Sequence, residues 1–240
     1  MFAAELLKVR SMPAPRLTLI ITLALVVISA VIVVVIAPEG SASTAYYEVP
    51  DLVAQVIISI GAIVLGAWIF GLEFSSKTLR LAATVQPSRQ QLVLVKLLSA
   101  VLLLLAYVVG VMAITLLLEA ILASVGSVAF PFGQQLDNAL RAGVEALIWG
   151  VFAFGLSLLF RSYTAGLVAA LVLALGVDAG LQQIPTVGKY SLGSATSSLG
   201  DAITGGAATL ALGVALLAVA AWLIVVIGAG AARFITRDLK

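Results

Sequence analysis

The sequence contains no cysteine and no histidine, and only 10% of its 240 residues are charged. The absence of cysteine excludes disulfide bonds and thiolate chemistry. The absence of histidine excludes His-based proton relays, haem ligation by His, and intramembrane proteases that use a Ser–His pair or a His-rich zinc site. The remaining residues show no catalytic constellation. We therefore expect neither a catalytic site nor a metal site, and we do not expect an enzyme.

Hydrophobic residues make up 62% of the chain, and the mean hydropathy is +1.22. A soluble domain is nearer about half apolar and about a quarter charged. The apolar runs are continuous, whereas the strands of a membrane β-barrel show short alternating segments. The sequence therefore predicts an all-α integral membrane protein that forms a single transmembrane domain over residues 1–240.

Six apolar runs are long enough to span a membrane, because a bilayer core needs about 20 such residues. We expect the six transmembrane helices at about residues 17–37, 52–72, 92–123, 141–160, 165–181 and 206–231. The first run is longer than the h-region of a signal peptide, although small residues after Gly40 leave cleavage as an alternative. Residues 1–16 are predicted to form an amphipathic interfacial helix. Residues 182–205 form a loop rich in Gly, Ser and Thr, which we expect to dip back into the outer face as short helical pieces.

Lysine and arginine residues gather on one side of this arrangement. If the N-terminus is placed in the cytoplasm, the outer segments keep only Arg141 and Lys189 of the 13 basic residues. This distribution is the positive-inside pattern. We therefore expect a multi-pass protein of the bacterial cytoplasmic (inner) membrane with both termini in the cytoplasm.

One polar stretch, residues 71–96, separates the second predicted span from the third. Its first part is predicted to form a short amphipathic helix up to about residue 86, and Pro87 ends it. Ser88 and Gln91 then form a capping-box pattern that starts the third span. A short helix between two spans buries no core of its own, so its side chains meet headgroups, water or a partner protein. The basic residues alone fit contact with anionic lipids, whereas the length of the segment favours a docking element.

The start of this stretch almost matches the phosphate-binding pattern G-x-x-x-x-G-K-[ST]. The match fails because Ser76 stands where the second glycine is required, and because the stretch follows a membrane span rather than a β-strand. We therefore expect the chain to bind no nucleotide or other cofactor. If the protein uses ATP, another polypeptide must bind it.

A few polar side chains lie inside or at the ends of the predicted spans, where charges are costly and often functional. Four of them are candidates for a substrate path: Gln55, Ser59, Glu119 and Asp178. Gln55 and Ser59 are four residues apart and share a helix face. Glu119 and Asp178 have no obvious local partner, and contact with water near the span ends is the alternative to a functional role. Arg141 and Glu145, also four residues apart, can pair with each other.

Small residues recur at four-residue spacing in two of the spans. Ala62 and Gly66 show this spacing in the second span, and Gly166 and Ala170 show it in the fifth. Faces of small residues allow membrane helices to pack closely. The pattern fits packing within one bundle or an interface between subunits.

The polar stretch resembles the segment between the second and third spans of ABC-2-type permeases, the transmembrane subunits of ATP-binding-cassette exporters with a type V-like fold. The residues that carry the resemblance are Glu5, Lys8, Gly71, Glu73, Lys77, Thr78, Leu79, Arg80, Pro87, Ser88, Arg89 and Lys96. Six spans, cytoplasmic termini and a polar loop before the last span also agree with this family. One departure is Lys77, because the family often has a glycine just before the threonine.

The resemblance implies a permease that exports a hydrophobic or amphiphilic substrate such as a drug, lipid or peptide along a path lined by the second and fifth spans. It also implies a coupling helix over residues 74–87 and short re-entrant helices before the last span. The implied contacts with the ATPase are Glu73, Phe74, Lys77, Thr78, Leu79, Arg80, Pro87 and Arg89. The implied partners are two separate ATP-binding subunits, which carry ATP and Mg²⁺, a second permease, identical or homologous, and membrane lipids, with no nucleic acid. The alternative is a membrane scaffold or assembly factor without a transport path.

Overall fold

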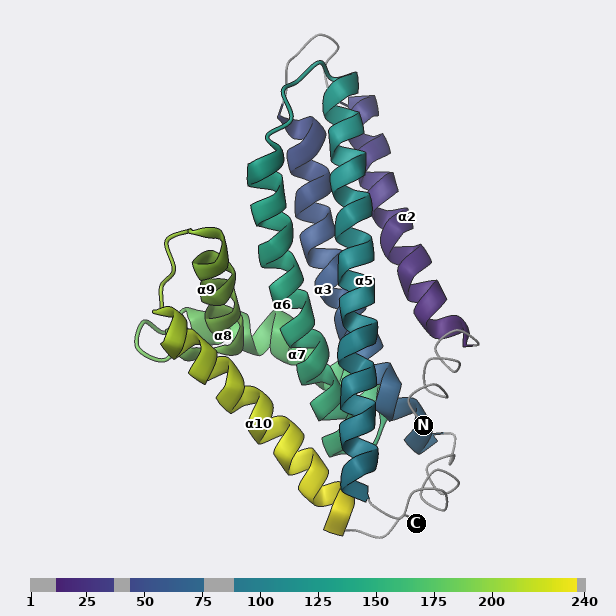
Figure 1. The fold of residues 1–240 in the computed structure, drawn as a ribbon, viewed down its shortest axis with the longest axis vertical. Coiled ribbons are helices and arrows are strands. Elements are labelled where there is room, and N and C mark those ends of the chain that lie inside the picture. Colours follow the sequence, from purple (N-terminus) through teal and green to yellow (C-terminus); the bar gives the residue numbers. More distant parts are fainter. Residues whose placement is uncertain (1–11, 37–43, 76–88, 237–240) are drawn as a thin grey trace.

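The computed structural model describes residues 12–36, 44–75 and 89–236. Within these ranges the regular structure is helical throughout, which confirms the all-α prediction. Six helical runs of the described residues are long and apolar enough to cross a membrane, as the sequence predicted (Figure 1). They are α2 (Pro13–Ile36), α3 (Ala45–Ser75), α5 (Arg89–Val125), α6 (Phe132–Phe160), the continuous run of α7 (Tyr163–Val172), η1 (Leu173–Val177) and α8 (Asp178–Gln182), and α10 (Leu212–Thr236).

Helices α3 and α5 are longer than the apolar runs within them. Helix α3 begins at Ala45, seven residues before the expected start of the second span, and continues through Pro50. Helix α5 has 37 residues, which corresponds to about 55 Å at a rise of 1.5 Å per residue. A hydrocarbon core is only about 30 Å thick. Helix α5 therefore either tilts in the bilayer or extends beyond it.

The segment rich in Gly, Ser and Thr before the last span contains a helix of its own, α9 (Leu192–Thr204). It follows a short 3₁₀ turn, η2 (Gly188–Tyr190). Ser191 caps α9, because its side chain accepts a hydrogen bond from the backbone N–H of Ser194. Gly205, at a φ of 76°, ends the helix. With 13 residues, α9 is too short to cross a bilayer.

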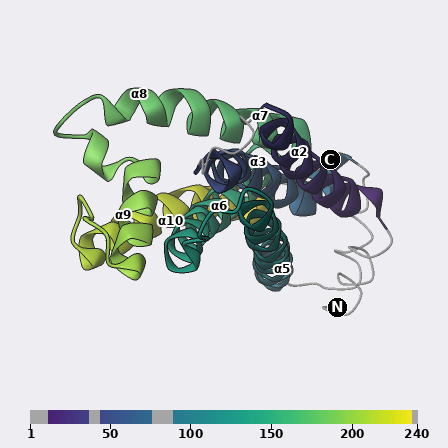
Figure 2. The same ribbon diagram turned by 90° about the horizontal axis from the view of Figure 1, so that it is seen from above.

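Helices α3 and α6 form the centre of the bundle and share the most extensive contact (Figure 2). Their backbones meet at two glycines, because a Cβ atom added to Gly66 would overlap the carbonyl oxygen of Gly150. A second close contact lies between α6 and α7, where a Cβ atom on Gly166 would overlap the backbone of Ser157. The small residues predicted from their spacing therefore serve packing within one bundle at these positions.

The outer helices expose apolar side chains, as expected of helices in contact with lipid. On α10, for example, Leu217 and Ile224 are exposed, whereas Ala215 and Val226 are buried. The run from α7 to α8 and helix α10 lie obliquely to the long axes of α3 and α5 (Figure 1). The π-helical turn η1 interrupts the first of these runs, and such turns bend a helix and often occur at functional sites.

Candidate functional site

A cavity of about 370 Å³ lies between α3, α6, the η1–α8 run and α9. Three of the four residues predicted for a substrate path line it, namely Gln55 and Ser59 of α3 and Asp178 of α8. Helix α6 adds Glu145 and Trp149 to the wall. The cavity has the size of a small-molecule site, for which about 300–1,000 Å³ is typical. The structure thus brings most of the predicted polar residues together in one place.

Asp178 is held by hydrogen bonds on both carboxylate oxygens. Its Oδ2 accepts a bond from Nε2 of Gln182 at 2.6 Å, and its Oδ1 accepts a bond from the backbone N–H of Gly193 at 2.9 Å. Gly193 is the second residue of α9, so the carboxylate caps the N-terminus of that helix. The expectation that Asp178 has no local partner was wrong. Its first role is to join α8 to α9 at the edge of the cavity.

Glu145 faces the same cavity without the partner that the sequence suggested. The guanidinium of Arg141 lies 3.0 Å from the carboxylate of Asp201 instead of pairing with Glu145. Of the two carboxylates that line the cavity, only that of Asp178 is hydrogen-bonded within the described part of the chain. The indole of Trp149 lies one helical turn beyond Glu145 on α6. The cavity therefore combines acidic side chains with an aromatic one, a combination that favours a cation with an apolar body.

Glu119, the fourth predicted path residue, lies outside this cavity. It lines a smaller cavity of about 20 Å³ between α3, α5 and α6, together with Asp51 and Gln55. Gln55 is shared by the two cavities. The structure thus separates Glu119 from Asp178 and joins it to a different acidic residue.

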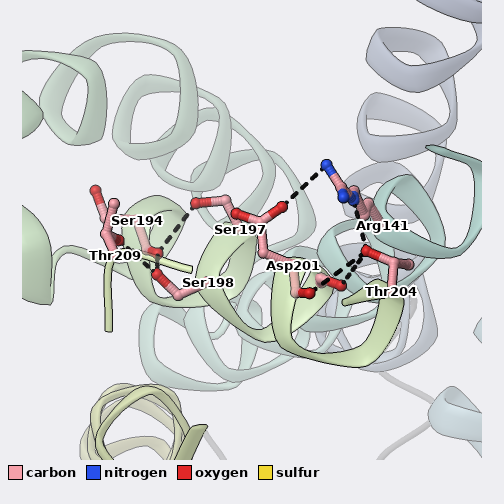
Figure 3. Close-up of polar contacts among 8 residues, drawn as sticks. Arg141, Ser194, Ser197, Ser198, Asp201, Thr204 and Thr209 are labelled. Carbon is pink, nitrogen blue, oxygen red and sulfur yellow. Dashed lines mark hydrogen bonds and ion pairs between the residues drawn. The ribbon is translucent and has the colours of Figure 1, made fainter. Parts of the chain in front are cut away.

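Helix α9, which forms one wall of the larger cavity, is fixed at its C-terminal end to α6 (Figure 3). Arg141 of α6 makes the ion pair with Asp201, and its Nε donates a hydrogen bond to Oγ1 of Thr204 at 2.8 Å. Nearer the middle of α9, the hydroxyls of Ser198 and Thr209 are 2.7 Å apart and link the helix to the segment before α10. Together with the Asp178 cap, these contacts hold the wall of the cavity in place.

We expect the Arg141–Asp201 ion pair to contribute only modestly to stability. The two side chains are 40% and 24% exposed, and exposed pairs contribute about 0.2–1 kcal/mol. Arg141→Met and Asp201→Asn should each lower the melting temperature by about 0.5–4 °C, as measured by tryptophan fluorescence in detergent. The double variant should be little less stable than either single variant. If the two effects add fully, the pair does not stabilise the docking of α9.

Four phenylalanines form an aromatic cluster at the lower end of the bundle in Figure 1, where α3 and α10 end: Phe70, Phe74, Phe154 and Phe234. The ring of Phe70 lies 5.2–5.6 Å, centroid to centroid, from the other three. The ammonium of Lys96, whose side chain is buried, lies 5.9 Å from the same ring. Phe74, expected to contact a partner ATPase, thus packs against other helices of its own chain.

Five other residues predicted for this contact lie outside the described residues, namely Lys77, Thr78, Leu79, Arg80 and Pro87. Most of the predicted interfacial helix at residues 1–16 also lies outside them. Glu73 and Arg89 belong to α3 and α5, with side chains outside the described part.

Two arginines join the ends of α6 and α10 beside this cluster. Nη2 of Arg161 donates a hydrogen bond to the carbonyl oxygen of Arg233 at 2.9 Å, and Nη1 of Arg233 donates one to the carbonyl oxygen of Leu159 at 3.0 Å. Carbonyl groups at helix C-termini lack partners within their own helix and favour nearby cations. The two bonds therefore tie the last turns of α6 and α10 to each other.

Residues 1–177 match the sequence profile of a family described as ABC-2 family transporter protein. The chain belongs to this family. It is a multi-pass membrane protein and a permease component of an ATP-binding-cassette transporter, rather than an enzyme itself, as the motif in the polar stretch predicted. No individual curated protein matches the chain.

Sequence reasoning missed several residues of the cavity in this ABC-2 permease. Glu145 was interpreted as the partner of Arg141, because the two are four residues apart. A helical projection shows the signal that was overlooked, since Glu145 and Trp149 are also four residues apart and therefore share a face. Gln182 and Ser197 were not found, because they lie in a segment whose fold the sequence did not predict in detail.

Proposed function

We propose that this permease exports an amphiphilic substrate that carries a positive charge and that enters the cavity between α3 and α9. The observation that carries the proposal is the cavity itself, whose wall combines Glu145 and Trp149 with other polar side chains and with apolar ones. Polar and ionisable groups inside membrane spans are expensive and mark pathways. A scaffold without a transport path needs no such cavity, so the transporter is favoured over that alternative.

Energy for export comes, in this proposal, from a separate ATP-binding subunit that carries ATP and Mg²⁺. The contact segment is residues 74–87, which begin in the last turn of α3 and end before α5. The aromatic cluster supports this role, because Phe70 and Phe74 of α3 pack against Phe234 of α10. A displacement of the segment after Ser75 is therefore transmitted directly to α10. Two ATP-binding subunits and two permeases, identical or homologous, form the complete transporter.

The lower end of the bundle in Figure 1 faces the cytoplasm in this proposal. Arg161 and Arg233 lie at this end, whereas Glu48 and Asp51 lie at the opposite end, where α3 begins. Such an asymmetry follows the positive-inside rule for a bacterial inner-membrane protein. The lead helix at residues 1–16 then rests on the cytoplasmic membrane surface, and α9 lies toward the outer side as the re-entrant piece.

Charge reversal in the contact segment tests the link to the ATPase. The triple variant Lys77→Glu, Arg80→Glu and Arg89→Glu should lower the substrate-stimulated ATPase activity of the purified complex about fivefold, a coupling change of about 1 kcal/mol. The reason is that Lys77 and Arg80 lie in the segment proposed to rest on the ATPase, and Arg89 follows that segment as the first residue of α5. ATP hydrolysis in proteoliposomes and the amount of co-purified ATPase are the measurements.

The matched control is Lys189→Glu, a charge reversal at an exposed lysine in η2, far along the chain from the contact segment. It should leave both measurements unchanged. If the triple variant keeps full coupling and full association, the docking role of residues 74–87 is wrong. If no ATP-binding subunit co-purifies with the wild-type chain, the proposal of an ATP-driven exporter is wrong.

A further inference from the structure

The small cavity between α3, α5 and α6 contains an acidic pair that the proposed export path does not use. Asp51 of α3 and Glu119 of α5 both line it, together with Gln55 and Thr115. Its volume of about 20 Å³ is enough for one particle the size of a water molecule. The cavity therefore has room for a single small ligand beside these four polar side chains, in a lining that is otherwise apolar.

Glu119 has no hydrogen-bond partner for either carboxylate oxygen within the described residues, although its side chain is only 1% exposed. The hydroxyl of Thr115, one helical turn earlier on α5, is also buried without a partner in the described part of the chain. Buried polar groups are nearly always hydrogen-bonded, and each exception requires an explanation. An isolated buried carboxylate is costlier still. These two side chains thus point to a ligand in the cavity that they line.

Asp51, on the other side of this cavity, is held by amide groups from two helices. Its Oδ2 accepts hydrogen bonds from Nε2 of Gln55 at 3.0 Å and from Nδ2 of Asn138 at 3.0 Å. The Asn138 amide also lies 3.5 Å from Oε1 of Gln135. The amides contribute no positive charge, so nothing described beside Asp51 and Glu119 balances the two acidic side chains. The site therefore holds two acidic side chains, one of them fixed by amide groups.

We propose that this cavity binds one small monovalent metal cation, such as Na⁺, between Asp51 and Glu119. Protonation of Glu119 alone would remove a charge but would leave the oxygens of Glu119 and Thr115 without partners. A water molecule would supply hydrogen bonds but no positive charge. A bound cation supplies positive charge and coordinates the lone pairs of the unpartnered oxygens of Glu119 and Thr115. A divalent ion fits less well, because Ca²⁺ requires about 6–8 oxygen ligands and Mg²⁺ keeps several waters, which the small volume does not admit.

Binding of ²²Na⁺ to the purified full-length chain tests the proposal directly. Equilibrium dialysis at constant ionic strength, with N-methyl-D-glucamine replacing Na⁺, should show saturable binding of about one ion per chain, the number that the cavity volume admits. Replacing N-methyl-D-glucamine by Na⁺ at several times the Na⁺ dissociation constant should raise the melting temperature by about 3 °C, because a ligand that binds only the folded state stabilises it. Both effects should disappear in Glu119→Gln and in Asp51→Asn, which preserve side-chain size.

The matched control is Glu48→Gln, which removes an exposed carboxylate from the first turn of the same helix as Asp51. This variant should retain the Na⁺ response. Thr115→Val, which keeps both carboxylates, should weaken Na⁺ binding and so provides a second reading if an acidic variant fails to fold. Equal stability in Na⁺ and N-methyl-D-glucamine, or ²²Na⁺ binding that is the same in the wild type and in Glu119→Gln, would overturn the proposal. Stability that responds to pH but not to Na⁺ would also overturn it, because the cavity would then hold a proton rather than a metal ion.

Discussion

Replacing Glu145 by glutamine should weaken the binding of a lipophilic cation about tenfold, which corresponds to about 1.4 kcal/mol. The substitution removes one of the two carboxylates of the larger cavity while keeping the size of the side chain. The remaining carboxylate, that of Asp178, is already engaged by Gln182 and Gly193. Glu145 is therefore the acidic group free to face a cationic ligand. Benzyltrimethylammonium is a suitable probe, because a quaternary ammonium ion also interacts favourably with the indole of Trp149.

Two comparisons separate the charge of Glu145 from its other properties. The neutral carbon analogue neopentylbenzene should bind wild type and Glu145→Gln equally well, with quenching of tryptophan fluorescence as the measurement. The control substitution is Asp137→Asn, which removes a carboxylate on α6 that lies outside the cavity lining. It should leave binding of both probes unchanged. Equal binding of the cation to the wild type and to Glu145→Gln would refute a cationic substrate and leave a neutral amphiphile as the ligand class.

Gly66→Ala should destabilise the bundle by about 3 kcal/mol and lower its melting temperature by about 10 °C. The added Cβ atom would overlap the carbonyl oxygen of Gly150. A backbone atom cannot rotate away as a side chain can, so α3 and α6 would have to separate along their most extensive contact. Thermal unfolding in detergent, followed by tryptophan fluorescence, measures the effect.

The control for this prediction is Gly110→Ala on α5. A Cβ atom there would meet no other atom within 4 Å, and alanine is favoured over glycine in a helix by about 1 kcal/mol. Gly110→Ala should therefore be as stable as the wild type or slightly more stable. If Gly66→Ala and Gly110→Ala have the same stability, the backbones of α3 and α6 do not meet as closely as the structure shows.

The number of spans and the all-α fold were predictable because both follow from one-dimensional properties. A run of about 20 apolar residues must form a helix in a bilayer, where backbone groups have no water to bond. The spacing of Ala62 and Gly66 likewise predicted a face for close packing. It did not reveal the partner of that face, because Gly150 lies 84 positions further along the chain.

The details of the cavity depended on contacts between distant segments and were therefore harder to predict. Asp178 finds its partner at Gly193 only once α9 has folded back against α8. Arg141 pairs with Asp201 rather than with Glu145 for the same reason. Spacing of four residues predicts which side chains can meet on one helix, but a partner on another helix can compete successfully. The sequence therefore named three side chains that line one cavity, Gln55, Ser59 and Asp178, but it grouped Glu119 with them and did not predict how they pair.

Gln55 borders both cavities, and its amide is bonded to Asp51 in the smaller one. A ligand in either cavity that fixes the orientation of this amide changes the groups that the other cavity presents. Thermodynamic linkage then requires that the effect be reciprocal. If an ion beside Asp51 tightens the binding of an organic cation beside Glu145, the organic cation must tighten the binding of the ion by the same factor. One glutamine side chain would thus let the concentration of a small ion bias the affinity for cargo.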